Sequence, residues 1–154
     1  MMQALGAEVV VLSGTAAKKA DGRRLGAHGF ILTSDSAEMA KNAGRLDLIV
    51  DTVSGQHDVG AALGLLNTGG TLALVGASPK PLELPAFPLI LARRQIAGSL
   101  IGGIAETQEM LDFCAKKKVY ADVEVIAPKE INAAYERLVK GDVRYRFSID
   151  LSKL

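Results

Sequence analysis

Two hydroxyl side chains and a lysine follow the first apolar run of the chain. Ser13, Gly14 and Thr15 come directly after residues 8–12, and Lys18 lies three positions further on. Hydroxyl donors beside a cation suit a phosphate group, which a carboxylate at this point would repel. A purely structural alternative is that Thr15 caps the next helix and that Lys18 is a solvated side chain.

Small and polar residues also lie at or just past the ends of three later apolar runs. Ligands of open α/β sheets bind along the carboxyl edge of the strands, and Gly76 lets a flat ring approach the backbone closely. The alternative is that these small and polar residues only terminate the strands. Asp51 closes one of these runs, and we expect it to hydrogen-bond nearby backbone rather than to act as a catalytic acid. The candidate residues are Thr52, Val53, Val75, Gly76, Ala77, Ser99, Leu100 and Ile101.

The remaining reactive residue types form no catalytic or metal-binding pattern. The chain has one cysteine and two histidines, without metal-ligand spacing. Cys114 falls on one helical stripe with Met110 and Leu111, which predicts a thiol in the core. His28 and His57 are predicted to be solvated loop residues without partners.

The composition is that of a soluble α/β domain. The chain has 154 residues, enough for one domain with a substantial core, and 49% of them are hydrophobic. Lys and Arg total 18 against 17 Asp and Glu, so the chain lacks the excess of positive charge that binds nucleic acid or anionic lipid. No apolar run is long enough to span a membrane, and no signal segment is recognisable. We therefore expect a cytoplasmic protein that binds neither nucleic acid nor membrane.

Short apolar runs alternate with helical stretches, which predicts a parallel, doubly wound sheet. Strands are expected at 8–12, 30–32, 46–50, 71–75 and 96–101. Helices are expected at 16–25, 36–43, 59–66, 89–94 and 106–117. A turn is expected at 67–70 and a proline-rich link at 79–88. The tail is expected to form a strand at 123–126, a helix at 129–140 and a strand at 145–151.

The first residues are expected to be the last turn of a helix, closed by Gly6. A helix of one turn that starts at residue 1 without a cap is an unusual domain start. We therefore expect a strand and most of its helix to precede this turn in the complete fold. Without that central strand, its two neighbours close up, the sheet splits, or another segment fills the place.

Five segments, in this order, resemble the zinc-type medium-chain dehydrogenases, and within them the cinnamyl-alcohol-dehydrogenase-like branch. The segments are 5–13, 47–54, 69–77, 97–114 and 131–147. They include Asp47-Leu-Ile-Val-Asp-Thr-Val-Ser54 and Gly69-Gly-Thr-Leu-Ala-Leu-Val-Gly-Ala77. The stretch 98–114 is the most specific to this branch.

The resemblance implies a Rossmann-like doubly wound parallel sheet lacking its first strand, plus a short C-terminal strand-helix-strand segment. Residues 1–118 would be an incomplete dinucleotide-binding domain, and 119–154 would return to the catalytic domain. The implied activity is NADP(H)-dependent hydride transfer between the nicotinamide and a primary alcohol or aldehyde. The family holds its catalytic zinc in a separate N-terminal domain, and this chain offers no zinc ligands.

The resemblance also implies roles for the candidate residues. The pattern formed by Ser13, Thr15 and Lys18 holds the NADP phosphate in the family, and the strand-end residues line the ribose and nicotinamide. Arg144 matches an arginine near the pyrophosphate, although Arg146 or a surface role are alternatives. No G-x-G-x-x-G motif occurs and no catalytic residue can be named. We therefore expect the isolated chain to be inactive and to bind NADPH weakly.

The strand at 96–101 is expected at the outer edge of the sheet, where an apolar strand invites pairing with a second chain. Members of the family dimerise through this strand, so a homodimer is expected. Two other functions stay open. One is a zinc-free quinone or enoyl reductase of the same superfamily, and the other is a truncated, non-catalytic NADP-binding or dimerisation module.

Overall fold

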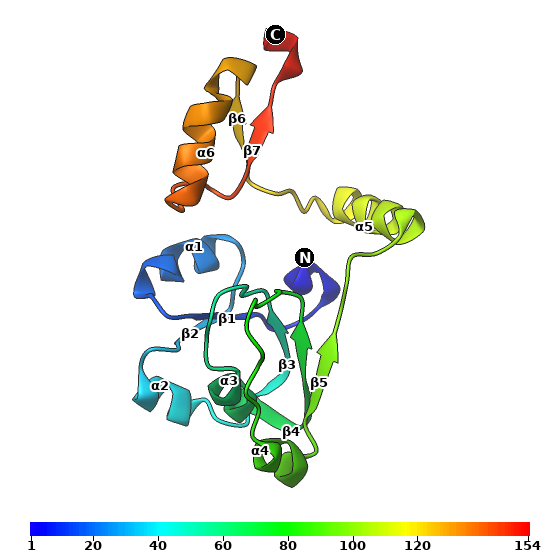
Figure 1. Ribbon diagram of the computed structural model, residues 1–154. Helices are drawn as coiled ribbons and strands as arrows, with labels where there is room; N and C mark the ends of the chain where they lie inside the picture. The colour runs from blue at the N-terminus through cyan, green and yellow to red at the C-terminus, as the bar shows by residue number, and fades with distance from the viewer. The chain divides into compact units, whose positions relative to one another are not determined.

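The chain folds into two compact units, residues 2–104 and residues 105–154. A computed structural model describes all 154 residues (Figure 1). Strands and helices alternate along both units, as the sequence predicts. None of the helices combines the length and the apolar character that crossing a membrane requires.

The first unit contains five strands and four α-helices. The strands are β1 (Val10–Ser13), β2 (Gly29–Leu32), β3 (Leu46–Asp51), β4 (Leu66–Leu74) and β5 (Gln95–Gly98). The helices are α1 (Lys19–Arg24), α2 (Ser36–Lys41), α3 (Val59–Leu65) and α4 (Ala86–Ala92). Single 3-10 turns, η1 (Met2–Leu5) and η2 (Ala16–Lys18), precede β1 and α1. The predicted helical turn at the start is therefore present, and Gly6 follows it with a φ of 93°.

The strands of this unit form two parallel sheets instead of one. β1 pairs with β2 in one sheet, and β3, β4 and β5 pair in that order in the other. No hydrogen bond joins β1 to β3. Of the three arrangements expected around a missing central strand, the split sheet is the one observed.

The core lies between α3 and one face of the β3-β4-β5 sheet. Leu63, Leu65, Leu66 and Leu72 are fully buried there. Asp58 begins α3, because its carboxylate accepts a hydrogen bond from the N–H of Ala61 at 2.8 Å. The helix thus starts at a defined point and presents its apolar face to the sheet.

The predicted turn at 67–70 lies inside β4 and is not a separate connection. The pairing with β3 jumps from Leu46 opposite Leu66 to Leu48 opposite Thr71, so β4 bulges over these residues. Gly69 has a φ of 80°, which explains the turn-like composition. The prediction of a separate turn was wrong because the strand resumes pairing on both sides of the bulge.

Two further predicted boundaries were wrong. α4 begins at Ala86, so Pro88 lies in its first turn, where its missing N–H removes no helical hydrogen bond. β5 ends at Gly98, so Ser99 to Ile101 lie beyond the strand. Only the N–H of Ser99 continues the pairing, by donating to the carbonyl of Leu74 at 3.0 Å.

The second unit confirms the predicted strand, helix and strand of the tail. α5 (Ile104–Lys117) leads to β6 (Glu124–Ile126), α6 (Ile131–Val139) and β7 (Phe147–Ile149), with β6 and β7 parallel. Arg137 on α6 makes ion pairs with Glu124 at 2.8 Å and with Asp142 at 3.1 Å, and it lies over the ring of Phe147. This arginine therefore ties the helix to both strands.

Cys114 is half-buried on α5, a helix without a buried residue. Its Sγ lies 3.7 Å from the Sδ of Met110, so the two side chains share a stripe as predicted. The thiol is not a core residue, because the stripe itself is not fully covered.

Candidate functional site

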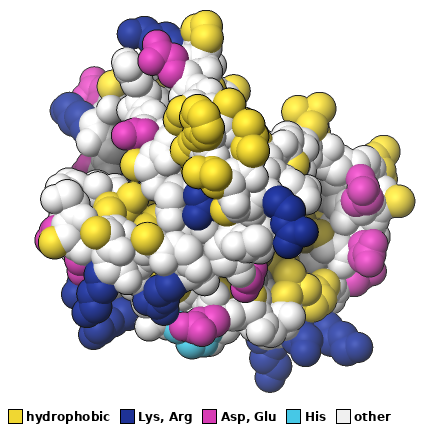
Figure 2. Space-filling model, turned by 90° about the horizontal axis from the view of Figure 1, so that it is seen from below, with side chains coloured by type: hydrophobic (Ala, Val, Ile, Leu, Met, Phe, Trp, Pro, Cys, Tyr) yellow, Lys and Arg dark blue, Asp and Glu magenta, His cyan; other side chains and the backbone are white.

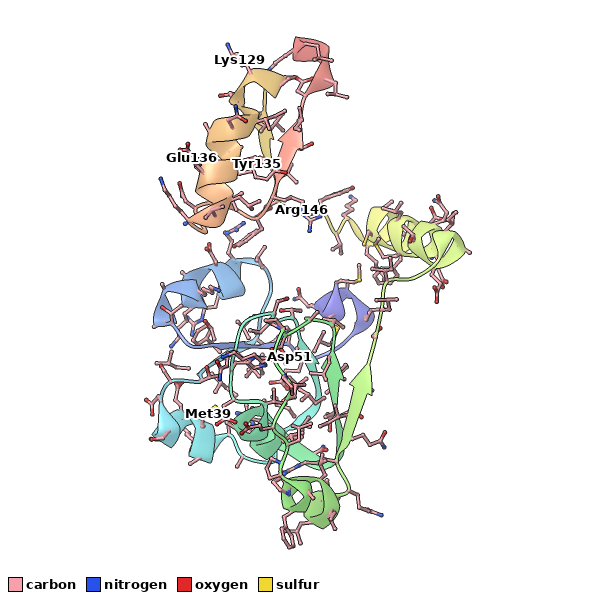
Figure 3. The ribbon with its side chains drawn as sticks, in the orientation of Figure 1. Met39, Asp51, Lys129, Tyr135, Glu136 and Arg146 are labelled. Carbon is pink, nitrogen blue, oxygen red and sulfur yellow. The ribbon has the colours of Figure 1, made fainter.

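A cavity of about 670 Å³ lies between β1 and β3 in the first unit. Its walls include residues 8–13, in and just before β1, and residues 48–53, in and just after β3, together with side chains of α2 and α3. Met39 and Asp51, both labelled in Figure 3, are among the lining residues. Four predicted cofactor residues lie along the cavity: Ser13, Gly14, Thr52 and Val53.

Asp51 connects the ends of β3 and β4. Its backbone carbonyl accepts hydrogen bonds from the N–H of Val75 at 2.9 Å and from the N–H of Gly76 at 3.0 Å. Its buried carboxylate accepts from the N–H of Val53 at 3.0 Å, as predicted for a residue that bonds nearby backbone. These contacts place 52–53 directly beside 75–76.

His57 also belongs to this cluster, so the prediction of a solvated histidine was wrong. Its Nε2 lies 2.7 Å from Oδ2 of Asp51, and its Nδ1 lies 2.9 Å from the carbonyl oxygen of Gly55. Both partners accept hydrogen bonds, so the imidazolium, which donates from both nitrogens, fits the site. The Gly55 carbonyl first, and then the Asp51 carboxylate against the opposing effect of burial, raise the pKa of His57.

His28 has a partner as well. Its Nδ1 accepts a hydrogen bond from the N–H of Val9 at 2.9 Å, just before β1. The sequence did contain a signal for the partners of His28 and His57. Each histidine lies in a short loop next to a strand end, where unpaired backbone groups or a carboxylate are within reach.

Gly76 is required by close packing of the two strand ends. A Cβ atom at this position would lie 2.6 Å from the carbonyl oxygen of Val53 and 2.7 Å from the carbonyl carbon of Thr52. Any larger residue would therefore separate β3 from β4 at the candidate site.

The loop after β1 has the structural role that the alternative interpretation predicted. Thr15 Oγ1 accepts a hydrogen bond from the N–H of Ala17 at 3.3 Å and caps the 3-10 turn. Ser13 Oγ accepts from the N–H of Thr15 and donates to its carbonyl, each at 3.2 Å. Lys18 is exposed on this turn. The loop is thus a defined turn with a cation beside it, which is compatible with an anionic ligand.

The other predicted residues are distributed over three places. Ala77 follows Gly76, whereas Leu100 and Ile101 are almost fully exposed beyond β5. Arg144 belongs to the second unit, between α6 and β7, as does Arg146, which Figure 3 labels. The backbone N–H of Arg144 donates to Glu124 at 2.9 Å and is the main cause of the lowered pKa of that carboxyl.

No group of three His, Cys, Asp or Glu side chains is arranged to hold a metal ion. The residues of this chain therefore do not fit a zinc site, and we assign no chemical step to a metal here.

Comparisons with known proteins identify a family. Residues 1–116 match a family model described as zinc-binding dehydrogenase. The chain is 52% identical, over its whole length, to an NADP-dependent alcohol dehydrogenase C of Mycolicibacterium smegmatis, and 53% identical, over 99% of its length, to a mannitol dehydrogenase of Petroselinum crispum. It spans only 44% and 45% of these two proteins.

Solved structures resemble the chain over almost its full length. A cinnamyl alcohol dehydrogenase from Sorghum bicolor matches 97% of this chain, with 43% identity and a TM-score of 0.91. A CAD from Helicobacter pylori, complexed with NADP(H), matches 98% with 37% identity and a TM-score of 0.81. This chain covers 43% of each of those chains. The expected Rossmann-like α/β fold with parallel pairing is therefore confirmed.

The contact around Gly76 generates a stability prediction. We expect Gly76→Ala to lower the free energy of unfolding by about 1–3 kcal/mol, because the added methyl group meets backbone atoms that cannot move aside. The matched control is Gly98→Ala, where a Cβ would meet nothing within 4 Å. Urea denaturation of both variants measures the effect. Equal midpoints for the two variants would contradict the close-packing argument.

The His57 contacts generate a pH prediction. Because the folded protein raises the pKa of His57 above the ordinary value of 6.5, the stabilisation is fully present below that value. It is lost as the pH rises through the folded pKa. We therefore expect the stability difference between the wild-type chain and His57→Gln to be largest in mild acid and to shrink in alkali. Urea denaturation across this pH range, with NMR titration of the imidazole, tests it, and a pH-independent difference would refute it.

Proposed function

The chain belongs to the zinc-binding dehydrogenase family, and we propose that it forms the cofactor-binding part of an NADP(H)-dependent alcohol dehydrogenase. The substrate class is a primary alcohol or the corresponding aldehyde. The activities for which these relatives are named support this proposal, and the chain spans less than half of their length. One structural observation carries the proposal: the ends of β3 and β4 meet at Asp51. Asp51 lies beside the cavity that Ser13 and Gly14 also line.

The strand ends suit a dinucleotide because they present backbone groups and small side chains along one edge. When bound, the nicotinamide would accept or donate the hydride. The residues of this chain would bind and orient it, and none of them is assigned a proton transfer. Within residues 1–118 we propose that the ribose and nicotinamide contact Thr52, Val53, Val75, Gly76, Ala77, Ser99, Leu100 and Ile101. From residues 119–154, Arg144 would contribute to the pyrophosphate.

A preference for NADP over NAD is assigned to the loop after β1. Ser13 and Thr15 offer hydroxyl groups, Lys18 offers a positive charge, and no carboxylate occurs between residues 9 and 20 to repel a 2′-phosphate. The ribose 2′-hydroxyl of NAD would gain no comparable interaction with the lysine.

The preference can be tested with two neighbouring lysines. We expect Lys18→Glu to weaken NADPH binding at least about tenfold, because a charge-assisted contact becomes a repulsion, and to leave NADH binding almost unchanged. Lys19→Glu makes the same change of charge one residue away and is the matched control. NMR titration to millimolar nucleotide covers weak binding. Equal losses in the two variants, or for NADH and NADPH, would refute the assignment.

We also propose that two copies of the chain associate through the outer edge of β5. The register of β5 on β4 and the hydrogen bond from Ser99 to Leu74 leave the backbone groups of Ile96 and Gly98 on the free edge. The exposed side chains of Leu100, Ile101 and Ile104 follow directly. An unpaired edge next to apolar side chains is suited to pairing with a second copy.

The edge can be blocked without disturbing β4. Gly98→Pro removes a backbone N–H that points away from β4, and we expect it to convert a dimer into a monomer. Gly98→Ala keeps the N–H and should stay dimeric. Sedimentation velocity measures the state of each variant. A monomeric wild-type chain, or a Gly98→Pro variant that stays dimeric, would overturn the proposal.

A further inference from the structure

Asp51 links the two strand ends of the candidate site to the loop that follows β3. Its backbone carbonyl accepts hydrogen bonds from the N–H groups of Val75 and Gly76, just past β4. One carboxylate oxygen, Oδ1, accepts from the N–H of Val53 at 3.0 Å, and the other, Oδ2, lies 2.7 Å from Nε2 of His57. The orientation of this one buried carboxylate therefore determines where the backbone of Val53 lies.

The backbone of this loop packs directly on Gly76. A Cβ atom at Gly76 would lie 2.6 Å from the carbonyl oxygen of Val53 and 2.7 Å from the carbonyl carbon of Thr52. Thr52 and Val53 are also the loop residues that would contact the ribose and nicotinamide under the function proposed above. Because the packing is close, a rotation of this segment either collides with residue 76 or opens a gap beside it. The position of residues 52–53 therefore depends on what holds the Asp51 carboxylate.

His57 holds both of its partners only when both ring nitrogens carry a proton. Its Nδ1 lies 2.9 Å from the carbonyl oxygen of Gly55, while its Nε2 faces Oδ2 of Asp51. Both partners are acceptors, and a neutral imidazole has one N–H, so it keeps one of these contacts and loses the other. The imidazolium keeps both and closes residues 51–57 into a fixed loop. Since both nitrogens are occupied, His57 acts on a ligand only through this loop.

The groups around the imidazole of His57 favour its protonated form. The backbone carbonyl at Nδ1 is the largest cause of the raised pKa of His57, and the carboxylates of Asp51 and Asp58 add to it against the opposing effect of burial. Lys80, on the segment after β4, brings a positive charge to the same loop. Its Nζ donates to Oε1 of Gln56 at 3.3 Å, so the ammonium group has a partner of its own there.

We propose that His57 is a positioning residue for the nicotinamide end of the cofactor, because its imidazolium holds residues 52–55 in the conformation that receives the ribose and nicotinamide. This inference rests on the proposed cofactor-binding function and adds its regulation by pH. NADPH binds the protonated chain more tightly, so the gain in affinity is fully present below the pKa of His57 in the free chain. It is lost as the pH rises through the pKa of His57 in the complex. Because such coupling is reciprocal, bound NADPH raises the pKa of His57.

The test measures NADPH binding by the full wild-type chain and by His57→Gln, with NMR titrations from the ordinary histidine pKa of 6.5 into alkali. We expect the variant to bind about three- to tenfold more weakly at the acid end, the effect of one lost hydrogen bond, and the two affinities to converge in alkali. The 2′-phosphate of NADPH also titrates, at about pH 6, but it does so with both proteins, so the ratio of their affinities isolates His57. The matched control is His28→Gln. His28 bonds the N–H of Val9 at the amino ends of β1 and β2, away from the candidate site, and this variant should bind like the wild type.

A second readout needs no nucleotide. In the wild-type chain the amide signal of Val53 should titrate together with the imidazole of His57, and in His57→Gln it should not. Three results would overturn the inference: a Val53 amide that does not follow His57, a ratio of NADPH affinities that does not change with pH, or an equal loss of affinity in His28→Gln. A wild-type chain that binds no NADPH would overturn the proposed function, and with it the cofactor half of the inference. The Val53 amide alone would then still decide whether His57 holds the loop.

Discussion

The parallel pairing of β3 with β4 determines where most of the candidate site lies. Parallel strands end on the same side of their sheet, and here the carbonyl of Asp51 accepts the N–H groups of both Val75 and Gly76. Leu63 on α3 and Leu72 on β4 are buried between this helix and the sheet, and their burial stabilises the paired strands. Burial of these leucines therefore stabilises the same arrangement that brings Thr52 beside Gly76. Leu89 of α4 packs against the same core, and other apolar side chains lie on the surface that Figure 2 shows.

The order of elements in this molecule follows from local patterns, whereas several boundaries do not. Continuous apolar runs such as 46–50 and 71–75 predict buried parallel strands, and the structure has them. The glycines at 69 and 70 look like a turn, yet they lie in a bulge, because only pairing with β3 determines whether a strand resumes. Pro88 looks like a linker residue, yet a proline in the first turn of a helix is tolerated. Both errors arise where tertiary pairing, or position within a helix, decides between two locally permitted conformations.

The histidine contacts show a second limit of local patterns. Asp51 and His57 are six residues apart, and nothing in that spacing requires contact. The contact forms because the loop folds back, with the Gly55 carbonyl bonded to one ring nitrogen and Asp51 bonded to the other. A buried carboxylate needs partners, and this requirement was predictable for the strand-end Asp51. The backbone of Val53 was the expected partner, and His57 is the additional one. The site is therefore held by a hydrogen bond between two side chains as well, where the sequence indicated backbone contacts only.

The split sheet links the cavity to the proposed cofactor edge. Ser13 and Gly14 lie on the β1 side of the cavity, and Thr52 and Val53 lie on the β3 side, in sheets that share no hydrogen bond. A nucleotide that contacts both sides has to fix their separation, and that ordering lowers its affinity. The hydrogen bonds that Asp51 makes fix the β3 side of this separation only. The distance between the ends of β1 and β3 therefore bears on cofactor affinity.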